Sequence, residues 1–176
     1  QVDYGSPIGD IKAADEMFNS RSSNFLIAER PHLRTTKTFA LIANMKVLAT
    51  PLWEVKLRDS TMNNIIVGLW LNSTYGVLIH LAHCTSDGGE IFKLKKGYIG
   101  ELLVPIINPS SEEYKNITTS SLKQSALKNL SHSCDESRRG IGVRHSIDEL
   151  FKNVIGKDLS RYYEALSKEP VITGKR

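Results

Sequence analysis

Six basic side chains in two short segments are the strongest chemical signal in this 176-residue sequence. They are Arg30, Arg34, Lys37, Lys93, Lys95 and Lys96. Three lie in the charged segment 29–37, and three follow a polar turn predicted over residues 85–89. Such cations would bind nucleic-acid phosphates regardless of sequence, while Arg, Asn, Gln or Ser side chains from loops would read base edges. Taken singly, each residue is better interpreted as an ordinary solvated charge.

The overall composition permits nucleic-acid binding without demanding it. Lys and Arg number 23 against 19 Asp and Glu, a formal net charge of +4 with a pI of about 9.0. The two cysteines, Cys84 and Cys134, lack zinc-ligand spacing, which favours a reduced cytoplasmic protein over a disulfide scaffold. The first residues lack the basic start and apolar run of a signal peptide. Because the sequence starts with Gln and not with Met, we expect either a piece of a longer protein or the remnant of a tag at its start.

Two short motifs raise the alternative of an enzyme. Glu54 and Lys56 on a predicted strand could form half of a metal-dependent nuclease site, although alternating Glu and Lys on the solvent face of a strand is commoner. His80 and His83 are three residues apart on a predicted helix, a spacing that can chelate a metal, with Cys84 adjacent. Without a further ligand nearby, contact with the last carbonyls of the helix is the favoured role of both histidines.

These side chains must be positioned by a fold whose centre is the apolar segment 65–81, which is predicted to form one buried helix. Ile65, Ile66, Leu69 and Trp70 recur at helical spacing, and apolar residues on a second face imply burial on both sides. Polar residues interrupt the middle of the segment, so we predict a core helix and not a membrane span.

Around this helix the sequence predicts an α+β fold, with a mixed sheet packed on the buried central helix and a helical C-terminal tail. Strands are predicted over residues 25–28, 38–45, 51–57, 92–95 and 102–107, and further helices over residues 10–18, 120–132, 147–155 and 159–167. We predict a linker over residues 108–119, a break over residues 135–142, and Ser146 as a helix cap. The resulting division is an α+β domain over residues 9–108 and a helical extension over residues 118–170.

Several short motifs follow one another in a fixed order. They are Leu71-Asn72-Ser73, Gly88-Gly89, Leu94-Lys95 and Leu102-Leu103-Val104-Pro105, followed by the stretch 144–174 with Arg144, Ile147 and Asp148 at its start. This ordered set resembles the target-recognition region of adenine-specific DNA methyltransferases from restriction-modification systems. In that family a Leu-Asn-Ser helix, a glycine turn, a Leu-Lys strand and a Leu-x-Val/Ile-Pro strand occur in this order. The tail of such proteins has an Arg-x-x-Ile-Asp segment that opens a helix.

The resemblance implies a DNA sequence-recognition domain that binds double-stranded DNA and does not itself methylate. S-adenosylmethionine (SAM) would lie on a methyltransferase catalytic domain in the same longer polypeptide or complex, which would flip and methylate the adenine. No cofactor, catalytic residue, metal or membrane contact is expected in this chain. A protein-interaction or scaffold domain is the alternative, and a nuclease built on Glu54 and Lys56 is the third hypothesis.

Methyl transfer by this chain is disfavoured because the necessary loops are incomplete. Gly88-Gly89 and Gly140-Ile141-Gly142 do not connect a convincing strand to a long helix, so turns are predicted there. The segment 108–111 (NPSS) starts like the Asn-Pro-Pro-aromatic motif of amino methyltransferases but lacks the second proline and the aromatic residue. A turn is predicted there as well.

Overall fold

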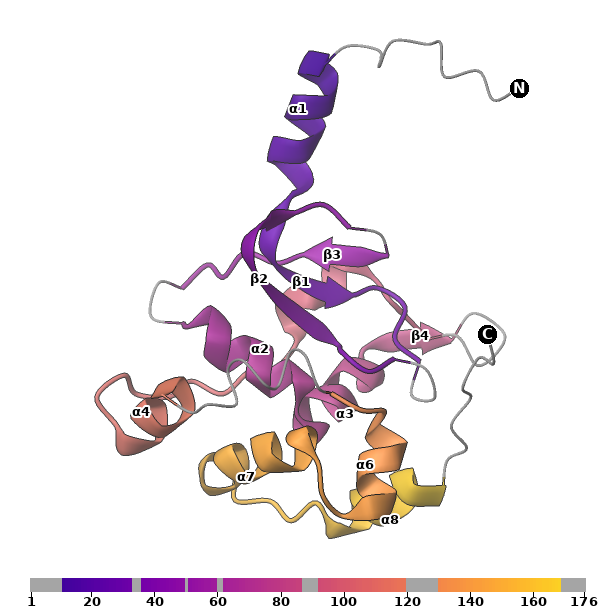
Figure 1. Cartoon of the computed structure of the whole chain (residues 1–176), viewed down its shortest axis with the longest axis vertical. Coiled ribbons are helices and arrows are strands. Elements are labelled where there is room, and N and C mark those ends of the chain that lie inside the picture. Colours follow the sequence, from indigo (N-terminus) through magenta and orange to yellow (C-terminus); the bar gives the residue numbers. More distant parts are fainter. Residues whose placement is uncertain are drawn as a thin grey trace.

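The computed structural model of the 176-residue chain describes residues 11–32, 36–49, 51–59, 62–86, 92–119 and 130–168. The fold is α+β, as predicted, with two antiparallel sheets, helices packed against them and a helical C-terminal region (Figure 1).

The larger sheet has β1 (Ser23–Ala28) at its centre, between β2 (Ala40–Val47) and β3 (Leu52–Glu54). Both pairings are antiparallel, so the sheet expected to be mixed is antiparallel in its described strands. Phe25 and Ile27 are fully buried, as expected for an apolar central strand whose faces are covered.

The smaller sheet pairs β4 (Cys84–Ser86) with β5 (Phe92–Leu94). The backbone N–H of Leu94 donates to the carbonyl oxygen of Glu29 at 2.8 Å, which joins this sheet to the end of β1. The glycine pair predicted to form the turn between these strands lies outside the described residues.

The single central helix expected over residues 65–81 is two helices, α2 (Asn64–Asn72) and α3 (Thr74–Ala82), with a bend of 79° at Ser73. Ser73 Oγ accepts a hydrogen bond from the Gly76 N–H at 3.0 Å and so caps α3, while the Ser73 N–H still closes the last turn of α2. No described helix is by itself long and apolar enough to cross a membrane. Only the bent pair α2 and α3 together reaches that length and composition.

Residues 108–119, predicted as a linker, contain the helix α4 (Glu112–Thr119). Ser111 Oγ accepts a hydrogen bond from the Tyr114 N–H at 3.2 Å, which caps the helix, and Ile117 is fully buried. The segment is too polar to show a helical pattern of apolar residues, so the helix was not predicted. One buried residue, Ile117, is enough to hold these two turns against the core.

The break predicted over residues 135–142 is mostly the helix α6 (Ser133–Arg139), with acids in its first turn and arginines in its last. The next helix, α7 (Val143–Ile155), starts after Gly142, so Ser146 lies inside α7 and does not cap it.

The strand predicted over residues 102–107 does not pair with any described strand. Trp70 Nε1 donates to the carbonyl oxygen of Leu103 at 2.8 Å, and Pro105 has no N–H to offer a ladder. This segment follows the 3-10 helix η1 (Lys96–Glu101) and is tied to α2 by the Trp70 hydrogen bond.

The helices α1 (Ile11–Arg21) and α8 (Ser160–Lys168) confirm the first and last helices predicted. Most of the helix predicted over residues 120–132 lies outside the described residues.

The helices α2 and α3 form a middle layer between the sheet and the helices α6, α7 and α8 (Figure 1). One hydrophobic core joins the layers, because it contains Phe25 and Ile27 from β1, Trp70 from α2, and Ile147 and Phe151 from α7. The two predicted domains therefore share a core.

Asn72, in the last turn of α2, is hydrogen-bonded to the start of β2. Its side-chain oxygen accepts from the N–H groups of Phe39 at 2.8 Å and Ala40 at 3.2 Å. Its side-chain amide donates to the carbonyls of Ala40 at 2.6 Å and Gly68 at 2.9 Å. The hydrogen-bonding capacity of this fully buried amide is thus filled.

Arg144 of α7 reaches the same point from the opposite layer. It is 2% exposed, and its guanidinium donates to the carbonyls of Asn72 and Lys37, the latter at 2.7 Å. One turn later, Asp148 accepts from the N–H of Thr74 at 2.6 Å and from the hydroxyl of Tyr163 at 2.7 Å. The Leu-Asn-Ser and Arg-x-x-Ile-Asp motifs are therefore in direct contact.

Replacing Asn72 by Ala should lower the free energy of unfolding by about 3–4 kcal/mol, because each buried backbone group left unpaired costs about 1–3 kcal/mol. Urea denaturation measures this change. Asn116→Ala on the exposed face of α4 is the matched control and should change it by less than about 0.5 kcal/mol. Equal stability of the two variants would contradict the role assigned to Asn72.

Candidate nucleic-acid interface

Arg30 and Lys93, far apart in the sequence, meet at the carboxylate of Glu29. The Arg30 Nε lies 3.8 Å and the Lys93 Nζ 3.9 Å from Glu29 Oε1. The contact is set by the backbone hydrogen bond between Glu29 and Leu94 described above. The Arg30 side chain is 54% exposed, while those of Lys93 and Glu29 are 34% and 18% exposed. A phosphate at this edge would therefore compete with Glu29 for both cations.

Lys96 continues the same edge at the start of η1. Its Nζ lies 2.6 Å from Glu54 Oε1 and 5.6 Å from the centroid of the Trp53 ring. This hydrogen bond is the main reason that the pKa of Glu54 is lowered. Lys95 precedes Lys96 and is exposed. We call Arg30, Lys93, Lys95 and Lys96 the basic edge.

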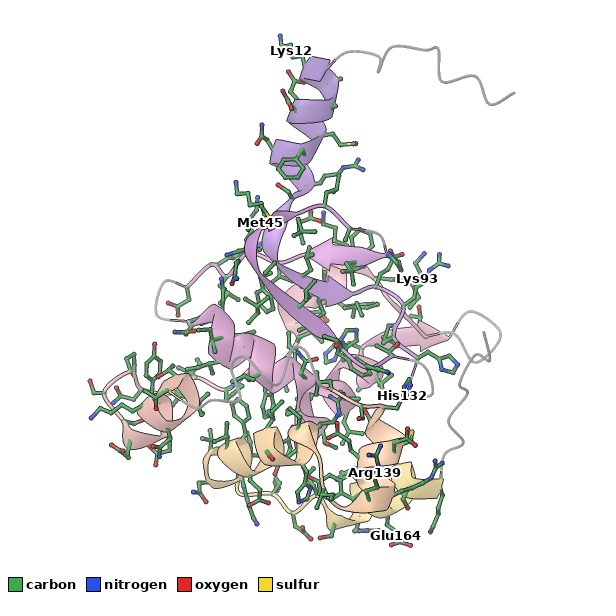
Figure 2. All side chains as sticks on the ribbon, in the orientation of Figure 1. Lys12, Met45, Lys93, His132, Arg139 and Glu164 are labelled. Carbon is green, nitrogen blue, oxygen red and sulfur yellow. The ribbon has the colours of Figure 1, made fainter. Side chains whose placement is uncertain are left out.

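The structure does not bring Lys37 into the basic edge by any described contact. The backbone carbonyl of Lys37 accepts a hydrogen bond from Arg144. The pKa of His132, at the start of α6, is lowered mainly by burial of the His132 ring and secondly by the charge of Lys37. Figure 2 shows Lys93 beside the sheet and His132 nearer to α6. Arg34 lies outside the described residues.

Two grooves on either side of residues 55–59 were missed by the sequence analysis. The first, of about 660 Å³, lies between the start of β1, β2 and the N-terminus of α2, and we call it the polar groove. The second, of about 480 Å³, lies between β3, α2 and η1, and we call it the apolar groove. Lys46 and Lys56 line the polar groove, while Lys56, Arg58 and Lys96 line the apolar groove.

From the sequence, Lys56 was considered only as part of a possible nuclease site. The local sequence around Lys46 and Arg58 did not distinguish these residues from other surface cations. Within the described part of the chain, none of these three cations forms a salt bridge. Their grouping depends on the turn after β3 facing α2, a contact between distant segments.

Of the two histidines predicted to contact the last carbonyls of the helix, His83 does so and His80 does not. His80 is fully buried, with its ring 5.7 Å from that of Phe39 and neither ring nitrogen hydrogen-bonded. His83 Nδ1 lies 2.8 Å from the carbonyl oxygen of Ile79, so this histidine has the predicted role. Among the described residues no three His, Cys, Asp or Glu side chains are placed to hold a metal ion.

Three turns are predicted in place of methyl-transfer motifs; those at residues 108–111 and at Gly140 are confirmed, and the one at Gly88-Gly89 lies outside the described residues. The side-chain oxygen of Asn108 accepts from the N–H of Ser110 at 2.9 Å, and its carbonyl accepts from the N–H of Ser111 at 2.9 Å. Gly140 ends α6 with φ of 64°, a conformation that favours glycine.

Comparison of the sequence with protein-family models found no matching family, and comparisons with curated proteins and with solved structures found no match either.

Burial lowers the pKa of His80 to about 4, and the nearby backbone of Ala28 offsets only part of this effect. As the pH falls below about 6.5, the unfolded chain gains a proton that folded His80 does not accept. The free energy of unfolding should therefore fall by about 3 kcal/mol between pH 6.5 and pH 4 from this residue alone. His80→Phe should remove that part of the slope in urea titrations across the range.

The matched control for His80 is Asn116→Ala, which leaves every titratable side chain in place and should keep the wild-type slope. A His80→Phe variant as acid-sensitive as the wild-type protein would exclude His80 as the source.

Proposed function

We propose that this chain is a DNA sequence-recognition domain of a restriction-modification methyltransferase and binds double-stranded DNA without catalysing methylation. The observation that carries the proposal is the convergence of Arg30 and Lys93 at one carboxylate, with Lys95 and Lys96 directly following along the chain. A row of exposed cations on adjoining elements is the arrangement that phosphate contacts need.

Hydrogen bonds join three of the motifs on which the resemblance is based. Asn72 and Arg144 belong to two separate motifs and meet through a buried hydrogen bond. Trp70 precedes the first motif and holds the Leu103 carbonyl of the Leu-x-Val-Pro motif. These motifs thus maintain one scaffold, and the residues that read bases would lie on the loops that the scaffold carries.

Under this proposal SAM and the methyl-transfer residues belong to a catalytic domain outside this chain. Leu103 and Ile106 are 69% and 81% exposed on the extended segment after η1, and exposed aliphatic side chains of this kind suit contact with another protein. The same observation favours the second candidate, a protein-interaction domain with no nucleic-acid role.

The salt dependence of duplex binding separates these two functions. For the wild-type domain, log affinity should fall linearly with log salt concentration, with a slope of about 0.9 per phosphate contacted. The triple variant Lys93→Ala, Lys95→Ala, Lys96→Ala should reduce that slope by about two to three. Fluorescence anisotropy of a labelled duplex gives both values.

Lys115→Ala, Lys152→Ala and Lys168→Ala together form the matched control, since these lysines are exposed on other helices and removal gives the same net charge. An unchanged slope in the basic-edge variant would show that these lysines do not contact DNA phosphates. Absence of duplex binding at low salt would favour the protein-interaction domain, and magnesium-dependent nicking abolished by Glu54→Ala would favour the nuclease.

A further inference from the structure

The polar groove has features of an anion site that the basic edge does not explain. Its wall includes Ser22, Lys46, Lys56, Asp59 and Asn63. At about 660 Å³ it is large enough for a phosphate with an attached nucleoside. Three features of its wall bear on its ligand.

The first feature is the N-terminus of α2. Asn63 Oδ1 accepts from the Ile65 N–H at 2.8 Å, and the Asn63 carbonyl accepts from the Val67 N–H at 3.0 Å. Helix geometry leaves the N–H groups of Asn64 and Ile66 without an intrahelical acceptor. The first turn contains no acidic residue, so the positive end of the helix dipole is not neutralised from within the helix.

The second feature is the hydroxyl of Ser22, which is 2% exposed and has no hydrogen-bond partner among the described residues. Its neighbour Ser23 shows the usual arrangement, since its hydroxyl donates to the Val55 carbonyl and accepts from the Phe25 N–H. A buried hydroxyl without a partner costs free energy unless a ligand supplies one. Ser22 therefore points to a ligand independently of the helix terminus.

The third feature is the charge of the wall. Lys46 and Lys56 are exposed and form no salt bridge with the described residues, and Asp59 is the one carboxylate among the described lining residues. The wall thus combines two cations, a helix N-terminus and a buried hydroxyl donor. Together these groups match the oxygens and the charge of a phosphate.

We propose that the polar groove binds a phosphate group through the N-terminus of α2, Ser22 and the two lysines. That this phosphate belongs to the DNA backbone rests on the proposed function. The phosphate site itself does not depend on that proposal. The groove lies at the start of β1 and the basic edge at its end, a separation of roughly 20 Å along a six-residue strand. That distance is about half a turn of duplex DNA, so one duplex can reach both sites.

Amide chemical shifts test the site with two ligands, inorganic phosphate and a 12-base-pair duplex. Both should shift the amide signals of Asn64 and Ile66. Lys56→Ala and Lys46→Ala, which change only exposed side chains, should each weaken phosphate binding about three- to tenfold. Ser22→Ala should weaken it about threefold or more, while Ser20→Ala on the exposed face of α1 is the matched control and should have no effect.

The two ligands also separate this inference from the proposed function. Phosphate shifts at α2 without any duplex binding would support the site, assign it to a small phosphorylated ligand and end the DNA proposal. If Lys46→Ala, Lys56→Ala and Ser22→Ala all leave duplex binding unchanged, the groove is not a phosphate site for DNA and the proposal for it is overturned. The role proposed for the basic edge would be unaffected. Unshifted signals of Asn64 and Ile66 with both ligands would likewise overturn it.

Discussion

The fold depends on the buried guanidinium of Arg144, which holds three layers at one point. Its two terminal nitrogens donate to backbone carbonyls, one at the α2–α3 junction and one just before β2. Burial lowers the pKa of Arg144, and the neighbouring carboxylates of Glu136 and Asp148 oppose that shift. A buried cation is tolerated only with such compensation, and losing one partner leaves an unpaired charge in the core. The bend at Ser73 is thus held by tertiary contacts as well as by its own cap.

The same junction determines where the candidate anion sites lie. Asn72 fixes the C-terminal end of α2 to β2, so the N-terminal end of that short helix points at the start of β1. The basic edge is fixed to the end of β1 by the hydrogen bond between Leu94 and Glu29. Two surfaces at opposite ends of one central strand are therefore held by backbone and buried amide contacts. At both surfaces the charge comes from long, flexible lysine side chains, and the backbone that carries them is held in place by rigid elements.

Sequence patterns were sufficient where the determining interactions are local or repeated. The apolar run 25–28 predicted β1, and the periodic segments near both ends predicted α1 and α8. The pattern of residues 65–81 did not reveal the bend, because both helices are apolar. In addition, the carboxylate that accepts from the first N–H of α3, that of Asp148, lies far along the chain. Clustering predicted Lys93, Lys95 and Lys96 as a group, whereas the polar groove depends on Ser22, Lys46 and Asn63 meeting, which no local pattern encodes.

The net charge of +4 does not show where the charges lie in the fold. Glu136 and Asp148 lie in the core, where they accept hydrogen bonds from backbone N–H groups and compensate Arg144. Asp135, Glu149 and Glu164 pair with basic residues one turn away on their own helices. Among the described residues on the sheet side, Glu29 and Glu54 pair with cations of the basic edge. Lys46, Lys56 and Arg58 line the grooves and form no salt bridge with the described residues, so their charge faces the solvent, where a polyanion would meet it.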